Sequence, residues 1–304
     1  MDASFALALL GLDGVGRVTA GRLLEHFPTY EALRDAPREQ VLLRLRGAPR
    51  AERTVDALFG GVMRAALEAA RATLRDLQDR HVQVLAPGHA HWPSGFDDLD
   101  RADRPVVLYA FGDTSALAAR PVALFGRAPL PAPPYEAAQA LARRLIAEGI
   151  GMACGARPGF DVALHKLCAA ARHPCVMVTR AGLARLDGPA RPSVAASVKA
   201  GGVLVTSFPP THGPFEHDDA ERARLQAALA GPSVFVAPRA ETPEARALDW
   251  ALDARRPVFA LDEDPPPDDA PAPLFTERVH RVDRPIDLDW VVAAARSKRD
   301  EGRT

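Results

Sequence analysis

An aspartate and a histidine that could share a proton lie four residues apart near the middle of the chain. Asp161 and His165 share one face of a predicted helix, because residues four apart lie one helical turn from each other. A carboxylate beside an imidazole has the composition of a general acid–base pair. However, no nucleophile or activated partner occurs at a suitable spacing. We therefore do not predict catalysis from this pair.

The segment around this pair is predicted to present backbone amides to an anion. Residues 150–153 form a predicted buried strand, and 154–159 a tight loop in which Gly155 and Gly159 allow a positive φ. We expect Asp161 to cap the helix that follows. A strand, a glycine loop and a helix N-terminus together favour phosphate binding. The alternative is an ordinary strand-to-helix turn with a capping aspartate and a packed histidine, since short glycine motifs also match by chance.

Composition indicates an ordinary globular protein of 304 residues with a net charge of −1. Any basic site must therefore be local. There are three cysteines, Cys154, Cys168 and Cys175; an odd number argues against a disulfide framework, and their spacing fits no zinc motif. We interpret His89 and His91 as solvated loop histidines. We expect neither a metal nor a cofactor. The absence of a signal peptide pattern and of a membrane-spanning run predicts a cytoplasmic protein that does not contact a membrane.

The first 80 residues are predicted to form a small all-helical domain. The stretch 11–27 (GLDGVGRVTAGRLLEHF) places apolar residues at helical spacing around a glycine-rich turn. Two short helices joined in this way are typical of a helix-hairpin-helix or SAM-like unit, whose turn amides can hold a nucleic-acid phosphate. The alternative is a small bundle that uses these glycines only to turn the chain.

From residue 81 onward, short apolar runs alternate with helical segments. This pattern predicts an α/β domain over 81–264 with a doubly wound, mostly parallel, Rossmann-like sheet. Ligands of such sheets bind beyond the carboxyl ends of the strands, at the switch point. The loops expected there are 126–134, 154–160, 206–215 and 238–242. Residues 265–304 are predicted to be a proline-rich linker and a short tail, with one strand within 274–282 and a helix over 288–296.

The order of these pieces resembles the bacterial DNA-processing protein A family, also called Smf. The N-terminal helices with their GVG turn resemble the small helical domain of that family, and Trp92-Pro93 and Gly112-Asp113 resemble the entry to its Rossmann-like domain. The spacing of Cys154-Gly155, Gly159, Asp161 and His165 is similar to its SGxAxGxDxxAH signature. Arg222 and Arg224 resemble the arginines of its RNRIIAGLS helix.

The chain also departs from the family pattern. The GSR motif is Gly126-Arg127-Ala128, the signature serine is Cys154, and the serine–glutamate pair after the next strand is Thr206-Ser207. Ala223 stands between the two arginines, and residues 241–243 replace the SGSL loop. The chain is thus identified as a diverged member.

The resemblance implies a non-enzymatic protein that binds single-stranded DNA, forms a homodimer and helps to load the RecA recombinase in natural transformation. The residues implied to bind DNA or phosphate are Gly126, Arg127, Cys154, Gly155, Arg157, Gly159, Asp161, His165, Arg222 and Arg224. Within the family, Asp161 is expected to cap its helix and His165 to brace the glycine loop. The dimer is expected to use apolar residues exposed at 234–237 and 258–261.

Three alternatives remain open. Arg222 and Arg224 are also interpreted as partners of nearby acidic residues on a solvated helix, because such pairs are common. A degenerate paralogue acting as a protein- or nucleotide-binding module would explain the lost Ser, Arg and Glu. A nucleotide-cleaving enzyme of the lysine-decarboxylase-like group would need a PGGxGT loop and a catalytic glutamate, which the sequence lacks.

Overall fold

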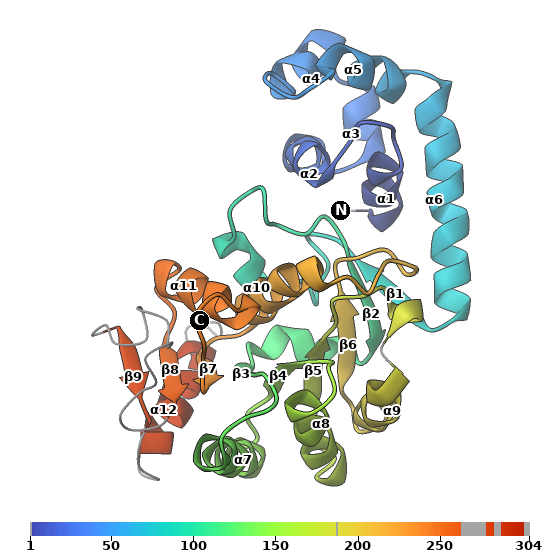
Figure 1. Cartoon of the computed structure of the whole chain (residues 1–304). Coiled ribbons are helices and arrows are strands. Elements are labelled where there is room, and N and C mark those ends of the chain that lie inside the picture. Colours follow the sequence, from blue (N-terminus) through green and yellow to red (C-terminus); the bar gives the residue numbers. More distant parts are fainter. Residues whose placement is uncertain (1, 187, 263–277, 283–286, 301–304) are drawn as a thin grey trace. The chain divides into compact units, whose positions relative to one another are not determined.

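The computed structural model describes residues 2–186, 188–262, 278–282 and 287–300. The chain divides into two compact units, one made of residues 1–92 and 99–110 and the other of 93–98 and 111–304 (Figure 1). Each unit is described by itself. The proposed linker over 263–273 and the frayed end over 301–304 lie outside the described residues.

The first unit is built mainly from helices around an apolar core that includes Phe5, Leu23, Leu33 and Met63, all fully buried. Strand β1 (Val82–Leu85) and most of β2 (Leu108–Gly112) also belong to it. Its helices are α1 (Ala3–Leu10), α2 (Arg17–His26), α3 (Tyr30–Arg34), α4 (Arg38–Arg44), α5 (Ala51–Phe59) and α6 (Gly61–Asp79).

The glycine-rich segment between α1 and α2 forms the predicted turn. Gly14 has φ +78°, a conformation that favours glycine, and Gly16 is the N-cap of α2. Leu12 and Val15 are buried beneath the turn. The glycines therefore have a sufficient structural role, and phosphate binding by this turn stays a prediction.

The second unit contains a parallel sheet that winds in two directions. Its strands follow the order β6-β5-β4-β3-β7-β8-β9, and each neighbouring pair is parallel. The predicted Rossmann-like class is thus confirmed. The strands are β3 (Val122–Gly126), β4 (Met152–Gly155), β5 (Cys175–Val178), β6 (Val203–Thr206), β7 (Ser233–Val236), β8 (Val258–Leu261) and β9 (Val279–Arg281).

Helices cover both faces of this sheet, which explains why its strands are apolar throughout. Figure 1 shows α10 and α11 on one face and α7 and α8 on the other. Alternate strand residues such as Leu124, Met152 and Val234 join the core with α7, α8, α9 and α12. The helices are α7 (Ala132–Ala147), α8 (Phe160–Ala170), α9 (Arg191–Lys199), α10 (Asp219–Leu229), α11 (Pro243–Asp253) and α12 (Leu288–Asp300).

Residues 93–98 pack against α10 within the second unit. The approach is close: a Cβ on Gly95 would lie 2.0 Å from the carbonyl oxygen of Ala228. Arg256 donates from Nη2 to the Gly95 carbonyl over 3.0 Å and to Asp98 over 2.6 Å. This short segment is therefore held by the second unit although its neighbours on both sides belong to the first.

Two expectations about the strands were wrong. Strand β4 extends through Cys154 and Gly155, which were expected in the loop, because both pair in register with β5. The apolar residues of β7 and β8 that were expected to be exposed at a dimer interface are buried: Val234 and Val258 are fully buried and Phe259 is 3% exposed. The cause is that helices, including α7 and α11, pack on both faces of these strands, and β9 in addition pairs with the edge of β8.

Candidate functional site

A hollow of about 160 Å³ lies where the winding direction of the sheet reverses. The chain runs from β3 toward β6 on one side and from β7 toward β9 on the other, so β3 and β7 flank the switch point. The hollow is lined by the last residues of these two strands and by the residues that follow them, with Phe125 and Phe235 stacked at a centroid distance of 4.6 Å. Open parallel sheets bind their ligands at this position.

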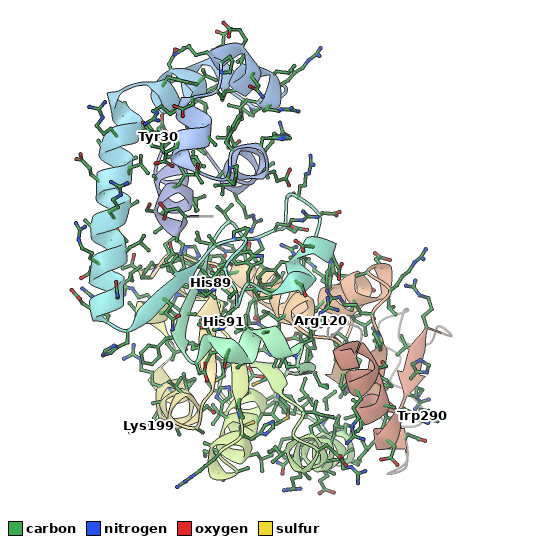
Figure 2. The ribbon with its side chains drawn as sticks, turned by 180° about the vertical axis from the view of Figure 1, so that it is seen from behind. Tyr30, His89, His91, Arg120, Lys199 and Trp290 are labelled. Carbon is green, nitrogen blue, oxygen red and sulfur yellow. The ribbon has the colours of Figure 1, made fainter. Side chains whose placement is uncertain are left out.

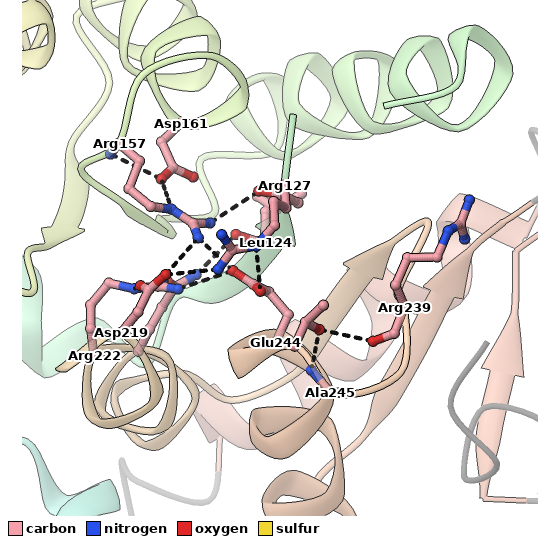
Figure 3. A network of polar contacts seen from close by, with 12 residues as sticks. Leu124, Arg127, Arg157, Asp161, Asp219, Arg222, Arg239, Glu244 and Ala245 are labelled. Carbon is pink, nitrogen blue, oxygen red and sulfur yellow. Dashed lines mark hydrogen bonds and ion pairs between the residues drawn. The ribbon is translucent and has the colours of Figure 1, made fainter. Parts of the chain in front are cut away.

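Two arginines and one helix N-terminus contribute charge to the hollow. Arg127 follows β3, and its side chain is 47% exposed. Arg239 follows β7, points away from Arg127 and Arg157 in Figure 3, and lies 3.8 Å from the buried carboxylate of Asp262. Thr242 caps α11 by accepting a hydrogen bond from the Ala245 amide over 3.1 Å. The positive end of the α11 dipole therefore adds to the two guanidinium groups.

Arg127 is the exposed member of a network of charged side chains beneath the hollow (Figure 3). It donates to Asp219 over 2.8 Å and to Glu244 over 3.2 Å. Arg157 lies 2.7 Å from Glu244 and donates to Asp219 over 3.1 Å. Arg222 donates to Asp219 over 2.6 Å and to Glu244 over 3.2 Å. Both carboxylates are thus shared by three guanidinium groups from three separate segments.

The arginines keep both carboxylates ionised. Burial acts to raise the pKa of Asp219, but the charges of Arg222 and Arg157 outweigh it and lower that pKa to about 2. Burial likewise opposes ionisation of Glu244, and Arg157 and Arg222 still lower the pKa of this carboxyl group. With Asp161, three carboxylates face three guanidinium groups, so the network is formally neutral.

The glycine loop binds the carboxylate of Asp161, an anion that belongs to the protein itself. Oδ2 of Asp161 accepts from the Arg157 amide over 3.1 Å and from Nε of Arg157 over 3.2 Å. A Cβ on Gly155 would lie 2.3 Å from this oxygen, so glycine is required to admit the carboxylate. Asp161 does not cap α8: Gly159, with φ +91°, is the N-cap, and Asp161 lies in the first turn. A side chain of the protein therefore takes the place predicted for phosphate.

His165 braces the loop as expected and is inaccessible. Its Nε2 lies 2.9 Å from the Gly155 carbonyl oxygen, which can only accept, so Nε2 carries the hydrogen. Its Nδ1 lies 3.1 Å from the Ser193 hydroxyl. Burial lowers the pKa of His165, although Asp161 partly opposes that shift. A fully buried imidazole with both nitrogens engaged orders the loop and has no surface for a ligand.

The structure brings together only part of the predicted site. Gly126, Arg127, Gly155, Arg157, Gly159 and Asp161 gather at the carboxyl edge. Cys154 is fully buried in the core, 3.5 Å from the sulfur of Cys175. Arg222 is 1% exposed, so its predicted direct contact with phosphate conflicts with its burial; the alternative pairing with Asp219 is the one observed. Arg224 is partly exposed on the same helix and lies outside the network.

Three residues of the site were not identified from the sequence. Glu244 was missed because it lies far from the arginines along the chain. Gln226 accepts from Arg222 and donates to the carbonyl oxygens of Leu124 and Ala153, which ties α10 to the sheet. Arg239 lines the hollow. The sequence did offer a signal by position, because Arg239 lies within the strand-end loop 238–242, which was itself predicted to reach the ligand, and Glu244 follows that loop by two residues.

The two loop histidines of the first unit lie side by side in Figure 2, with ring centroids 5.5 Å apart. His89 is exposed and His91 is half-buried. Among the described residues, no group of three or more histidine, cysteine, aspartate or glutamate side chains is arranged to hold a metal ion.

Within the same described part of the chain, no helix is long and apolar enough to cross a membrane.

Comparisons with known proteins agree with the fold. The model of the family described as DNA recombination-mediator protein A matches residues 83–272. The structure of DNA processing protein A from Streptococcus pneumoniae aligns with a TM-score of 0.61 and 15% identity, over 91% of this chain and 98% of that chain. DNA processing protein A from Helicobacter pylori, studied for its single-stranded DNA binding mode, aligns with a TM-score of 0.57 and 18% identity, over 70% and 96%. No curated protein matches the chain in sequence.

Proposed function

The chain belongs to the DNA recombination-mediator protein A family, and on this premise we propose that it binds single-stranded DNA at the switch-point hollow. The observation that carries the proposal is Arg127, a half-exposed guanidinium group at a hollow over the N-terminus of α11. Charge of this kind contacts phosphate without reading base sequence. We further propose a non-catalytic, cytoplasmic role in which the bound strand is passed to the RecA recombinase.

The organisation into a helical domain over 1–80, a Rossmann-like domain over 81–264 and a tail over 265–304 is also part of the proposal. We also propose that the protein forms a homodimer, and the family resemblance supports this proposal. Sedimentation velocity at micromolar concentration measures it directly, and a monomer throughout that range would contradict it. The buried residues of β7 and β8 are not its interface.

DNA binding is tested by anisotropy titrations with labelled oligo-dT across a salt series. We expect Arg127→Ala to weaken binding equally for all sequences and to flatten the log–log salt slope by ~0.7 for one lost contact. Arg143 on α7 donates to Gln139, and Arg143→Ala is the matched control, with no expected change. An unchanged slope for Arg127→Ala would contradict the assignment of the hollow.

A second candidate function follows from the neutrality of the network. Because Asp161, Asp219 and Glu244 already compensate Arg127, Arg157 and Arg222, little net positive charge is left for a polyanion. A degenerate paralogue that binds a protein or a nucleotide instead of DNA would have this property. Wild-type protein that shows no salt-dependent oligo-dT binding would favour this candidate.

RecA loading is tested separately, as stimulation of the RecA ATPase on DNA coated with single-strand-binding protein.

A further inference from the structure

Four aromatic rings gather in the segment that connects β6 to α10. Phe208 and His212 are stacked, with centroids 4.5 Å apart and planes within 4°. Phe215 meets the edge of His212 at 5.3 Å and stacks with His217 at 5.5 Å, with planes within 8°. These four rings, here called the aromatic ladder, lie beyond the carboxyl end of β6, and all but His217 belong to the loop 206–215 that was predicted to reach the ligand.

The ladder is held in place by hydrogen bonds of its own loop. The His212 amide donates to the Pro209 carbonyl, and the His212 carbonyl accepts from the Gly182 amide, both over 2.9 Å. A Cβ on Gly182 would lie 2.1 Å from the Pro209 oxygen, so the two segments are in close contact. Asp218 fixes the rings from the helix side: its carboxylate lies 2.7 Å from Nε2 of His212 and 3.4 Å from Nε2 of His217.

The outer two rings are exposed although the loop is ordered. Phe215 is 50% exposed, and the His217 side chain is 78% exposed. Contacts within the ladder and with Asp218 hold these rings, yet much of their surface is left open to solvent. Two nearly parallel rings that face solvent provide a flat surface of the kind on which nucleic-acid bases stack, and such stacking accepts any base.

A small hollow that contains Arg180 adjoins the ladder. Pro214, which precedes Phe215, lines this small hollow together with Arg157, Arg180 and Arg222. Arg157 and Arg222 are occupied by the network carboxylates. Arg180 has no ion pair among the described residues. Asp218 contacts the ladder directly, 2.7 Å from His212 and 3.4 Å from His217, so we expect phosphate on the Arg180 side, away from this carboxylate.

We propose that the aromatic ladder is a base-stacking platform for single-stranded nucleic acid, with the bases on Phe215 and His217 and the backbone on the Arg180 side. This inference rests on the proposed DNA binding and adds the group that the bases contact. It separates two contributions: the arginines contact phosphate and the ladder contacts bases. A protein partner that covers the same apolar rings is the competing occupant.

The test compares oligo-dT with an abasic oligonucleotide of equal length, which keeps the phosphates but lacks bases. We expect wild-type protein to prefer oligo-dT, and Phe215→Ala with His217→Ala to bind oligo-dT about 5- to 100-fold more weakly while binding the abasic strand as before. The salt slope should not change, because no phosphate contact is lost. Phe215→Trp should keep the preference for oligo-dT.

The matched control is Trp290→Ala on α12, because Trp290 is 51% exposed, like Phe215, and lies elsewhere in the second unit (Figure 2). Its binding should equal that of wild type. Photo-crosslinking with 5-iodouracil gives an independent measurement, and we expect adducts within 208–217. The base-stacking proposal alone would be overturned if the double variant bound oligo-dT like wild type, or if its affinities for oligo-dT and for the abasic strand fell equally. Wild-type protein that binds neither oligonucleotide would overturn both proposals.

Discussion

Nη1 of Arg157 lies 2.7 Å from Oε1 of Glu244, which joins the loop after β4 to the first turn of α11. The two residues come from opposite sides of the switch point, because β4 belongs to the first winding direction and α11 follows β7. Their ion pair, shared with Arg127 and Arg222, therefore ties the two halves of the sheet together beside the candidate hollow, which Glu244 lines.

Loss of Arg222 should be strongly destabilising. Arg222→Ala leaves Asp219 and Glu244 buried with fewer counter-charges, and breaking a buried pair in this way costs about 3–5 kcal/mol. Arg224→Ala on the same helix is the control and should cost about 1 kcal/mol or less. Urea denaturation of both variants measures the difference. Equal midpoints would contradict the structural role assigned to Arg222.

Substitution of the loop glycines should also destabilise the fold. Gly159→Val forces a β-branched residue to φ +91°, with a strain of about 1–3 kcal/mol, and its Cβ would lie 2.8 Å from that of Ala128. Gly155→Ala places a methyl group 2.3 Å from the Asp161 carboxylate. Thermal denaturation checks both variants. Gly188→Ala is the control, because a Cβ there meets no atom within 4 Å.

Stability should fall in acid because of Asp219 and Glu244. The pKa of Asp219 is about 2 in the folded state and ~3.9 when unfolded, so the unfolded chain takes up the proton first. The contribution, about 2–3 kcal/mol for Asp219, is present above pH ~5 and is lost as pH falls toward 2. The lowered pKa of Glu244 acts in the same direction. Denaturant unfolding at a series of pH values should show this loss, and Asp219→Asn should reduce its slope.

A smaller loss of folding stability, due to His165, should begin at a higher pH than the loss due to Asp219. Burial lowers the pKa of His165 below its ordinary ~6.5, so below that pH the unfolded state binds a proton that the folded state does not. Stability should therefore decrease as pH falls below ~6.5 and level off once pH passes the folded pKa. His165→Gln should abolish this component only. A variant that keeps the same slope between pH 6.5 and 5 would contradict the assignment.

Glu244→Gln should strengthen DNA binding if the hollow is the site. The substitution removes one negative charge beside Arg127 and Arg157, which leaves the network with a net positive charge. We expect tighter oligo-dT binding and a salt slope steeper by up to ~0.7. The fold should be less stable, so unfolding is measured alongside anisotropy. Weaker binding by a folded variant would argue against a phosphate site at this position.

The sequence by itself determined the class of the fold and the place of the site. Alternating apolar strands and helices require a covered parallel sheet, and the ends of parallel strands share one edge, so loops such as 126–134 and 238–242 had to meet. The family resemblance further implied that His165 braces the glycine loop, which its contact with the Gly155 carbonyl confirms. The ring-rich stretch 208–217 was equally visible as four aromatic rings in ten residues, but no pattern of strand or helix drew attention to it.

Only the tertiary structure decided which charges are available to a ligand. Arg222 and Arg127 are both arginines at strand or helix ends, yet one is 1% and the other 47% exposed. Both guanidinium groups contact Asp219 and Glu244. They differ in exposure because Arg222 lies on α10, which packs against α11 and the sheet, whereas Arg127 lies in the loop after β3 that lines the hollow. Helices packed on both faces of the sheet also bury the residues that were expected at a dimer interface. Burial is set by neighbours distant in sequence, so local patterns do not predict it.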